Sequence, residues 1–184
     1  SVYAASKLSM ELISNSYISN YKMKIIGLRF FSVYGPWGRP DMAYYKFVRT
    51  ILNGKAIEVY NYGNHYRSFT YIDDVVEGVC SLINKPPSLK QLGKIKNDSL
   101  SPVAPFRILN IGNTNKVYLL DFINAIEKEL KVKAIRNYMP LQKGDVKITL
   151  SNINLLKKIT GYNPKTKYKI GIRKFLKWYL DYYN

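Results

Sequence analysis

Near the start of the chain, Tyr3 and Lys7 are residue types that together can act as a general base. On a helix, side chains four residues apart emerge on the same face. A free phenol, with an ordinary pKa of about 10, is a poor base at neutral pH, and a nearby ammonium group favours its phenolate form. Because the chain has 17 tyrosines, the spacing by itself is better explained by a solvated pair on a helix.

The stretch from Gly27 to Met42 has the pattern of a strand that leads into a ligand site. Its apolar first half, ending at Phe31, is typical of a short buried parallel strand. Its second half is rich in glycine and proline and cannot form regular structure. Open α/β sheets place ligands beyond the carboxyl ends of their strands, so the stretch is a candidate site wall. An ordinary irregular connection has the same pattern, and the pattern does not decide between the two.

Other catalytic arrangements find little support in the sequence. His65 is the only histidine, so a zinc site with several histidine ligands is excluded, and we expect no metal. The adjacent acids Asp73 and Asp74 do not converge on a helix and are better explained as helix caps. The sequence has no G-x-G-x-x-G or Walker motif, so the phosphate-binding turn of any nucleotide cofactor would lie outside it.

Composition narrows the class of protein. The chain has 184 residues, of which 47% are hydrophobic, enough for one well-cored domain or for one lobe and part of another. The net charge of +17 comes mostly from scattered lysines, without a basic block, and we expect no nucleic-acid partner. No stretch approaches the about 20 apolar residues of a membrane span, so we expect no membrane partner. The single cysteine, Cys80, fits a reducing, cytoplasmic compartment and is predicted to be buried.

Hydrophobic periodicity predicts alternating helices and strands, and therefore an α/β fold. The predicted helices cover residues 2–20, 43–53, 73–83, 118–130 and 151–161, with a last helix from about 168. The predicted strands cover residues 25–31, 57–60, 67–72, 106–111 and 133–138. Ser151 and one of Asp73 and Asp74 are the predicted N-caps, and the polar segment 85–105 is a predicted surface loop.

Several short motifs follow one another along the chain. They are Y-A-A-S-K at 3–7, L-R-F-F-S-V-Y-G-P-W-G-R-P-D-M at 28–42, V-Y-N-Y-G at 59–63, R-S-F-T-Y-I-D-D-V-V-E-G at 67–78, N-I-G-N at 110–113 and P-L-Q-K-G-D-V at 140–146. This series resembles the nucleotide-sugar epimerases of the extended short-chain dehydrogenase/reductase (SDR) family, most of all the UDP-glucuronate 4-epimerases. The resemblance covers nearly the whole chain except about residues 85–105. It implies the C-terminal portion of an NAD-binding Rossmann-like fold plus a smaller α/β substrate-binding domain.

The resemblance also implies a mechanism. Tyr3 matches the catalytic base, which takes the proton of the C4 hydroxyl as a hydride passes from C4 to NAD. Lys7 matches the residue that binds the nicotinamide ribose and favours the phenolate, and Phe30 would line the nicotinamide. The resulting 4-keto sugar would turn over in the site and receive the hydride on its other face, so that NAD remains a catalytic cofactor.

The substrate implied by the resemblance is a UDP-sugar. The implied contacts are Ser32 and Arg67 with the diphosphate, Arg39 with the sugar carboxylate, Tyr60 with uracil and Asp145 with the uridine ribose. A planar guanidinium suits a carboxylate, which supports the role of Arg39. Gln142 is the sixth residue expected to contact the substrate. Galactose-type epimerases carry an arginine at its position, which argues against UDP-galactose.

Domain boundaries follow from the same resemblance. We expect residues 1–35 to end the Rossmann-like domain with the catalytic helix and the following strand. Residues 36–184 would mainly form the substrate domain, with about 67–84 and 106–113 returning to the Rossmann side. The chain starts at Ser1 with almost no lead-in to its first helix, so we expect a piece of a longer protein that lacks its upstream half and is inactive alone.

Partners and alternatives complete the sequence-based picture. The resemblance implies a homodimer in the full-length protein and a role in polysaccharide biosynthesis. A nucleotide-sugar 4,6-dehydratase or decarboxylase of the same fold remains an alternative, although those enzymes need an acid pair just upstream of the tyrosine. A non-catalytic UDP-sugar-binding remnant also remains open, and an upstream glycine-rich turn would argue against it.

Overall fold

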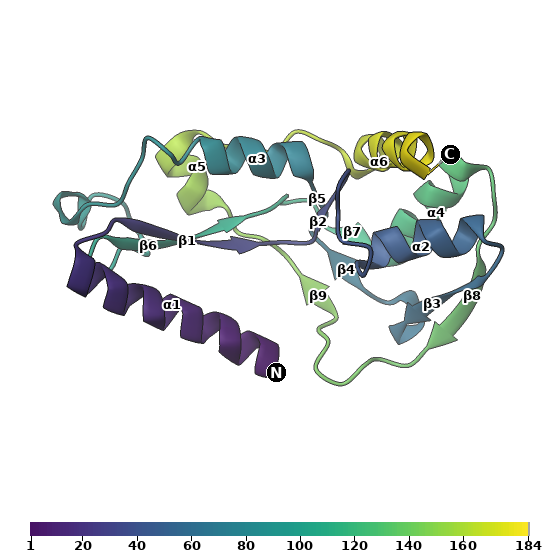
Figure 1. Cartoon of the computed structure of the whole chain (residues 1–184), viewed down its shortest axis with the longest axis horizontal. Coiled ribbons are helices and arrows are strands. Elements are labelled where there is room, and N and C mark those ends of the chain that lie inside the picture. The colour runs from purple at the N-terminus through teal and green to yellow at the C-terminus, as the bar shows by residue number, and fades with distance from the viewer. Residues whose placement is uncertain (184) are drawn as a thin grey trace. The chain divides into compact units, whose positions relative to one another are not determined.

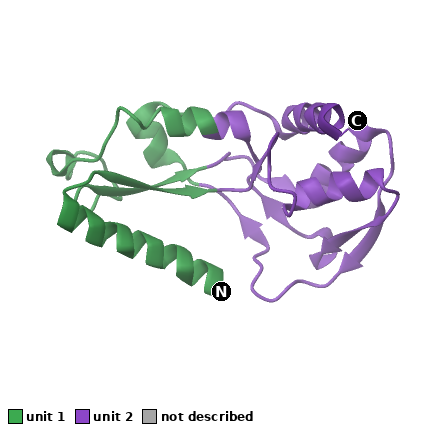
Figure 2. Cartoon of the chain, viewed as in Figure 1, with its two compact units in different colours: residues 1–30, 76–111, 152–163 green, residues 31–75, 112–151, 164–184 purple. Residues whose placement is uncertain are grey.

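The computed structural model describes residues 1–183 and divides them into two compact units. Unit 1 comprises residues 1–30, 76–111 and 152–163, and unit 2 comprises residues 31–75, 112–151 and those from 164 on (Figure 2). Helices alternate with strands that pair mostly in parallel, which confirms the predicted α/β class (Figure 1). No helix among residues 1–183 is both long and apolar enough to cross a membrane.

Unit 1 is built on one parallel pair of strands. Its elements are α1 (Val2–Tyr21), β1 (Ile25–Phe30), the 3-10 turn η2 (Leu89–Gln91), β6 (Phe106–Ile111) and α5 (Asn154–Thr160), and α3 (Ile72–Cys80) begins in unit 2 and ends here. Figure 1 shows α1 and α5 on opposite sides of the pair formed by β1 and β6. Ile18 and Phe106 are buried together in the core between α1 and the strands.

Two predictions about unit 1 are wrong. The strand at 25–31 was expected to be buried, but β1 is half-buried to exposed because β6 is its only strand partner among the described residues. Cys80, expected to be buried, is exposed at the end of α3. A small apolar residue is often buried, but the last turn of this helix points its side chain to the surface of the unit.

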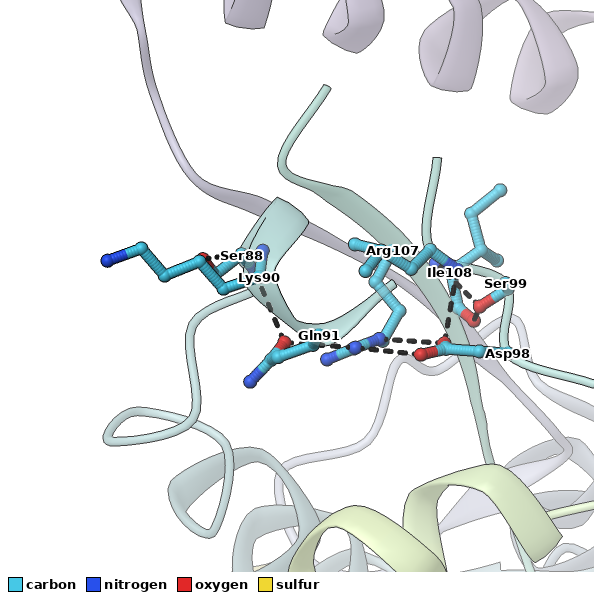
Figure 3. Close-up of polar contacts among 8 residues, drawn as sticks. Ser88, Lys90, Gln91, Asp98, Ser99, Arg107 and Ile108 are labelled. Carbon is cyan, nitrogen blue, oxygen red and sulfur yellow. Dashed lines mark hydrogen bonds and ion pairs between the residues drawn. The ribbon is translucent and has the colours of Figure 1, made fainter. Parts of the chain in front are cut away.

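The segment 85–105 is a loop, as predicted, with η2 as one short turn within it. One buried ion pair anchors it to β6 (Figure 3). Asp98 accepts two hydrogen bonds of 2.9 Å from Arg107, and Gln91 accepts a third of 3.1 Å. The side chains of Arg107 and Asp98 are 1% and 7% exposed, so this polar loop carries a desolvated charge pair at its base.

Unit 2 packs three helices against short strands. Its elements are β2 (Val33–Tyr34), α2 (Ala43–Leu52), β3 (Ala56–Tyr60), the 3-10 turn η1 (Asn61–Gly63), β4 (Tyr66–Arg67), β5 (Thr70–Tyr71), β7 (Val117–Tyr118), α4 (Leu119–Leu130), β8 (Ile135–Met139), β9 (Ile148–Thr149) and α6 (Tyr168–Tyr183). Strand β2 pairs with β5 and β3 pairs with β8, both in parallel, while β4 lies between β7 and β9.

The helices of unit 2 bury most of the apolar residues that their periodicity predicted on one face of each helix, but Leu52 of α2, predicted on the same face as Phe47, Val48 and Ile51, is 42% exposed. The residues on those faces form one core: Phe47, Val48 and Ile51 of α2, Phe122, Ile123 and Ile126 of α4, and Ile172, Phe175, Leu176 and Tyr179 of α6. The predicted strand 67–72 is instead two short strands, β4 and β5, which pair with different neighbours.

Both predicted N-caps are wrong because these side chains bond to distant backbone. Ser151 Oγ donates to the Asn113 carbonyl, and α5 begins three residues later without a side-chain cap. Asp74 lies in the first turn of α3, and its carboxylate accepts from the backbone N–H of Thr166 at 3.0 Å. Each polar group is thus satisfied by a segment that is remote in sequence.

The loop between β2 and α2 requires glycine at two positions. Gly35 has a φ of 141°, which side chains rarely adopt, and a Cβ there would lie 2.6 Å from Ile72. A Cβ on Gly38 would lie 1.6 Å from the hydroxyl of Tyr44, and this O–H donates to the Gly35 carbonyl at 3.4 Å. The glycine-rich sequence of this loop therefore serves close packing within unit 2.

Candidate functional site

The acid–base pair expected from the sequence lies on α1 in unit 1. Ser1 caps this helix by accepting from the Ala4 N–H at 3.2 Å. One turn along, the ammonium of Lys7 lies 5.4 Å from the centroid of the Tyr3 ring, on the face that the spacing predicted. Tyr3 is 71% exposed, and its ring is open to solvent. Phe30, at the end of β1, is likewise exposed.

A cavity of about 620 Å³ lies within unit 2. Five of the six residues expected to contact substrate are among those that line it: Ser32, Tyr60, Arg67, Gln142 and Asp145. The ends of β3 and β4, the segment after β1 and the loop after β8 carry these residues. The fold therefore gathers on one cavity side chains that lie up to 113 residues apart in the sequence (Ser32 to Asp145).

An ion pair forms the most polar wall of this cavity. Arg67 donates to the Asp145 carboxylate at 3.0 Å, and its other terminal nitrogen donates to the carbonyls of Tyr66 and Lys147 at 3.1 Å each. Burial lowers the pKa of the Arg67 guanidinium, and the carboxylate of Asp145 opposes that shift. Because the Arg67 side chain is only 17% exposed, its charge is weakly screened by solvent and can act strongly on a ligand anion.

Ser32 reaches the cavity from a strained backbone. Its φ of 37° lies in the left-handed region, which is uncommon for residues other than glycine. Thr70 fixes it from both sides: its N–H donates to the Ser32 carbonyl at 3.1 Å, and its hydroxyl donates to the Phe31 carbonyl at 2.9 Å. Strained residues held in this way cluster at binding sites, which agrees with the position of Ser32 on the cavity wall.

Tyr60 and Gln142 line the same cavity from β3 and from the loop after β8. The phenol of Tyr60 donates to Glu58 at 2.7 Å, and this hydrogen bond to a carboxylate raises the pKa of Tyr60. The ring therefore stays neutral and offers a flat apolar face. The backbone carbonyl of Gln142 accepts from the backbone N–H of Asp145 at 3.2 Å, which joins the two residues within the loop.

Arg39 is placed differently from the other expected substrate residues. Its side chain is 75% exposed and forms an ion pair with Asp41 at 3.4 Å. Asp41 and Met42 line the cavity, whereas Arg39 is not among the lining residues. Arg39 thus precedes the lining residues Asp41 and Met42 by two and three positions in the sequence. Its contact with a sugar carboxylate stays a prediction.

The sequence did not predict several of the residues that line the cavity. Among them, His65 is both polar and buried. His65 is 3% exposed and lies two residues before Arg67. Side chains two apart in an extended segment point to the same side, so the period of two around Arg67 was the signal that could have found it. Among residues 1–183, no group of three or more histidine, cysteine, aspartate or glutamate side chains is placed to hold a metal ion.

Comparison with known proteins identifies relatives of the chain. Residues 1–97 match the model of the NAD dependent epimerase/dehydratase family. Protein CapI of Staphylococcus aureus is 47% identical over 184 residues, which cover all of this chain and 55% of CapI. UDP-glucuronate 4-epimerase 3 of Arabidopsis thaliana is 45% identical over 188 residues, covering all of this chain and 43% of that protein.

Solved structures agree with the fold. The UDP-glucuronic acid 4-epimerase from Bacillus cereus, in complex with UDP-glucuronic acid and NAD, superimposes with a TM-score of 0.83 at 28% identity. The match covers 100% of this chain and 54% of the epimerase chain. The chain thus spans about half the length of the relatives that it matches.

Proposed function

Because the chain belongs to the NAD dependent epimerase/dehydratase family, we propose that it is part of an NAD-dependent epimerase that inverts C4 of UDP-glucuronate. One observation carries this proposal: five residues assigned to substrate by their motifs line one cavity in unit 2. The relatives that are named UDP-glucuronate 4-epimerases support the choice of substrate.

The cavity suits the nucleotide end of such a substrate. In the proposed arrangement Arg67 attracts the diphosphate, whose charge it can neutralise, and Ser32 adds a hydroxyl donor beside it. Asp145 accepts from a ribose hydroxyl, and the neutral ring of Tyr60 packs on uracil. Arg39, exposed on the adjoining loop, grips the carboxylate of the sugar with its planar guanidinium.

The residues of unit 1 carry the proposed proton transfer. Tyr3 takes the proton of the C4 hydroxyl as a phenolate and later returns it, while the ammonium of Lys7 favours the phenolate. NAD, when bound, would supply the hydride acceptor for C4 and then the donor, so that a 4-keto sugar stands between substrate and product. Exposed side chains of unit 1 fit such a cofactor. Tyr3 and Lys7 offer polar groups for its hydroxyls, and Phe30 offers an apolar ring for its nicotinamide.

The same proposal assigns unit 1 to the cofactor and unit 2 to the UDP-sugar. It places the protein in the cytoplasm, in polysaccharide biosynthesis, and as a homodimer in its full-length form. It also holds that the 184 residues alone are inactive, since the chain carries no G-x-G-x-x-G turn for the dinucleotide phosphates.

The experiment is product analysis by NMR after the longest natural protein containing this chain is incubated with UDP-glucuronate and NAD. We expect UDP-galacturonate, the product of inversion at C4. A decarboxylated pentose product, or no change in a protein that binds the substrate, would refute the epimerase assignment.

A matched pair of variants tests the acid–base role. Tyr3→Phe removes the phenol, and we expect it to lower turnover by about 100-fold or more while leaving binding of UDP-glucuronate unchanged. Tyr17→Phe changes an exposed tyrosine of the same helix and serves as the control, with turnover near that of the unaltered protein. If Tyr3→Phe retains full activity, the base is misassigned.

A further inference from the structure

His65 is a buried polar side chain whose ring makes no hydrogen bond to another described residue. It is 3% exposed, and both ring nitrogens are buried. Its backbone is fixed on both sides, since its N–H donates to the Gly63 carbonyl at 2.8 Å and its carbonyl accepts from Leu119 at 2.9 Å. A buried ring nitrogen without a partner is costly, so such a group calls for a function.

The cavity of unit 2 supplies the setting for that function, because His65 is among its lining residues. The Nε2 atom of His65 lies 3.5 Å from Oδ2 of Asp145, too far for a good hydrogen bond. The other carboxylate oxygen, Oδ1, is already occupied, since it accepts from Arg67 at 3.0 Å and from the Val146 N–H at 2.8 Å. One acceptor and one ring nitrogen, neither with a hydrogen-bond partner among residues 1–183, therefore lie 3.5 Å apart on two residues that line the cavity.

These two atoms together select a particular ligand group. A phosphate oxygen placed against His65 would also meet the negative charge of Asp145, which disfavours it. A hydroxyl has both parts that are needed: its hydrogen can be donated to Asp145, and its oxygen can accept from an N–H on Nε2 of His65. A neutral imidazole in the tautomer with its hydrogen on Nε2 provides that donor.

We propose that His65 and Asp145 jointly bind a ribose hydroxyl of the uridine nucleotide, so that His65 sets the preference for ribose over deoxyribose. This inference rests on the proposed function, since it takes the occupant of the cavity to be a uridine diphosphate. It adds to that function a residue that determines which sugar the nucleotide must carry. His65 binds the ligand and takes no part in the transfer of the C4 proton.

The test is isothermal titration calorimetry of the 184-residue chain with UDP, 2′-deoxy-UDP and 3′-deoxy-UDP. For the unaltered chain we expect at least one deoxy analogue to bind about tenfold or more weakly than UDP, because it leaves the His65 and Asp145 groups unpaired. His65→Phe keeps a flat ring of similar size but has no donor. In that variant the dissociation constant of the discriminated deoxy analogue, divided by that of UDP, should fall toward 1, mainly because UDP binds more weakly.

Two further variants complete the test. His65→Gln retains a side chain that can donate and accept, and we expect it to keep most of the preference for UDP. His65→Leu also lacks a donor and gives the same measurement if thermal unfolding shows that the phenylalanine variant is not folded. A purely structural role of His65 would weaken all three nucleotides equally, and that result would overturn the inference.

The outcomes separate this inference from the proposed function. If the chain binds UDP and His65→Phe keeps the full preference, or the unaltered chain has no preference, the role of His65 is wrong while the epimerase proposal stands. If neither the unaltered chain nor the longest natural protein containing it binds a uridine nucleotide, the cavity is misassigned and both proposals fail.

Discussion

Removal of the Asp98 carboxylate is the sharpest test of how the loop at 85–105 is held. In the native structure this carboxylate and the Arg107 guanidinium are desolvated together, with two hydrogen bonds of 2.9 Å. Asp98→Ala leaves a guanidinium that is 1% exposed with only the neutral Gln91 as a side-chain acceptor. An uncompensated buried charge of this kind costs about 3–5 kcal/mol in free energy of unfolding.

An ion pair of the same geometry but different burial provides the control. Arg29 and Glu11 also form two hydrogen bonds, of 2.8 Å each, within unit 1. The side chain of Arg29 is 54% exposed, so solvent screens the pair. Exposed pairs contribute roughly 0.2–1 kcal/mol, and Glu11→Ala should therefore cost several times less than Asp98→Ala. Both pairs join an arginine to a carboxylate through two hydrogen bonds, and they differ in burial. Asp98 also accepts from the Leu100 N–H at 3.1 Å, so Asp98→Ala removes that hydrogen bond as well.

Urea denaturation followed by circular dichroism measures both losses. With a urea dependence of about 2 kcal/mol per molar, Asp98→Ala should lower the midpoint for unit 1 by about 1.5–2.5 M, and Glu11→Ala by about 0.5 M or less. Both tryptophans of the chain, Trp37 and Trp178, lie in unit 2, so their fluorescence follows the folding of that unit.

Two results test whether the buried ion pair between Asp98 and Arg107 holds the loop. Replacing both charges, Asp98→Leu with Arg107→Leu, removes the unpaired ion and should recover much of the stability lost in Asp98→Ala. If Asp98→Ala lowers the free energy of unfolding no more than Glu11→Ala does, the Arg107 guanidinium reaches solvent or another acceptor. The claim that a buried ion pair anchors the loop would then be wrong.

Three further predictions concern unit 2. Arg39→Ala, tested in the full-length protein, should weaken binding of UDP-glucuronate by about tenfold or more but hardly affect UDP-glucose; equal losses in calorimetry would argue against a carboxylate contact. Gly38→Ala puts a methyl group 1.6 Å from the Tyr44 hydroxyl and should cost about 1–3 kcal/mol in urea denaturation, whereas Gly27→Ala, with 3.6 Å to its nearest neighbours, should avoid that clash. Burial, followed by the nearby aspartates, raises the pKa of Tyr71 from 10.0 to about 12. The protonated phenol thus contributes stability that is fully present below pH 10 and is lost as the pH rises from 10 to 12. The melting temperature of Tyr71→Phe should therefore decrease less over that pH range than the melting temperature of the unaltered chain.

The sequence predicted those features that depend on neighbours a few residues away. The apolar stripes of α4 and α6 were found from a period of 3.6, and the structure buries Phe122 and Phe175 on them. The strand at 106–111 was found with its exact bounds, because a short apolar run ended by Gly112 has few alternatives. Motif order added what periodicity cannot supply, since it assigned Arg67 and Asp145 to one ligand.

The two errors about helix caps share one physical cause. Ser151 and Asp74 have the local pattern of helix caps, but each bonds to backbone that packing brings near, at Asn113 and Thr166. A short polar side chain takes whichever partner tertiary packing presents, and local sequence does not contain that information.

Residue types, helical faces and the order of motifs were thus determined by the sequence alone. Only the tertiary structure decided that Arg67 pairs with Asp145 across 78 positions, that Arg107 is buried against Asp98, and that His65 lies without a hydrogen-bond partner on the cavity wall. Such contacts depend on how β4, β6 and the loops that face them pack, because burial and long-range pairing are properties of the folded chain as a whole.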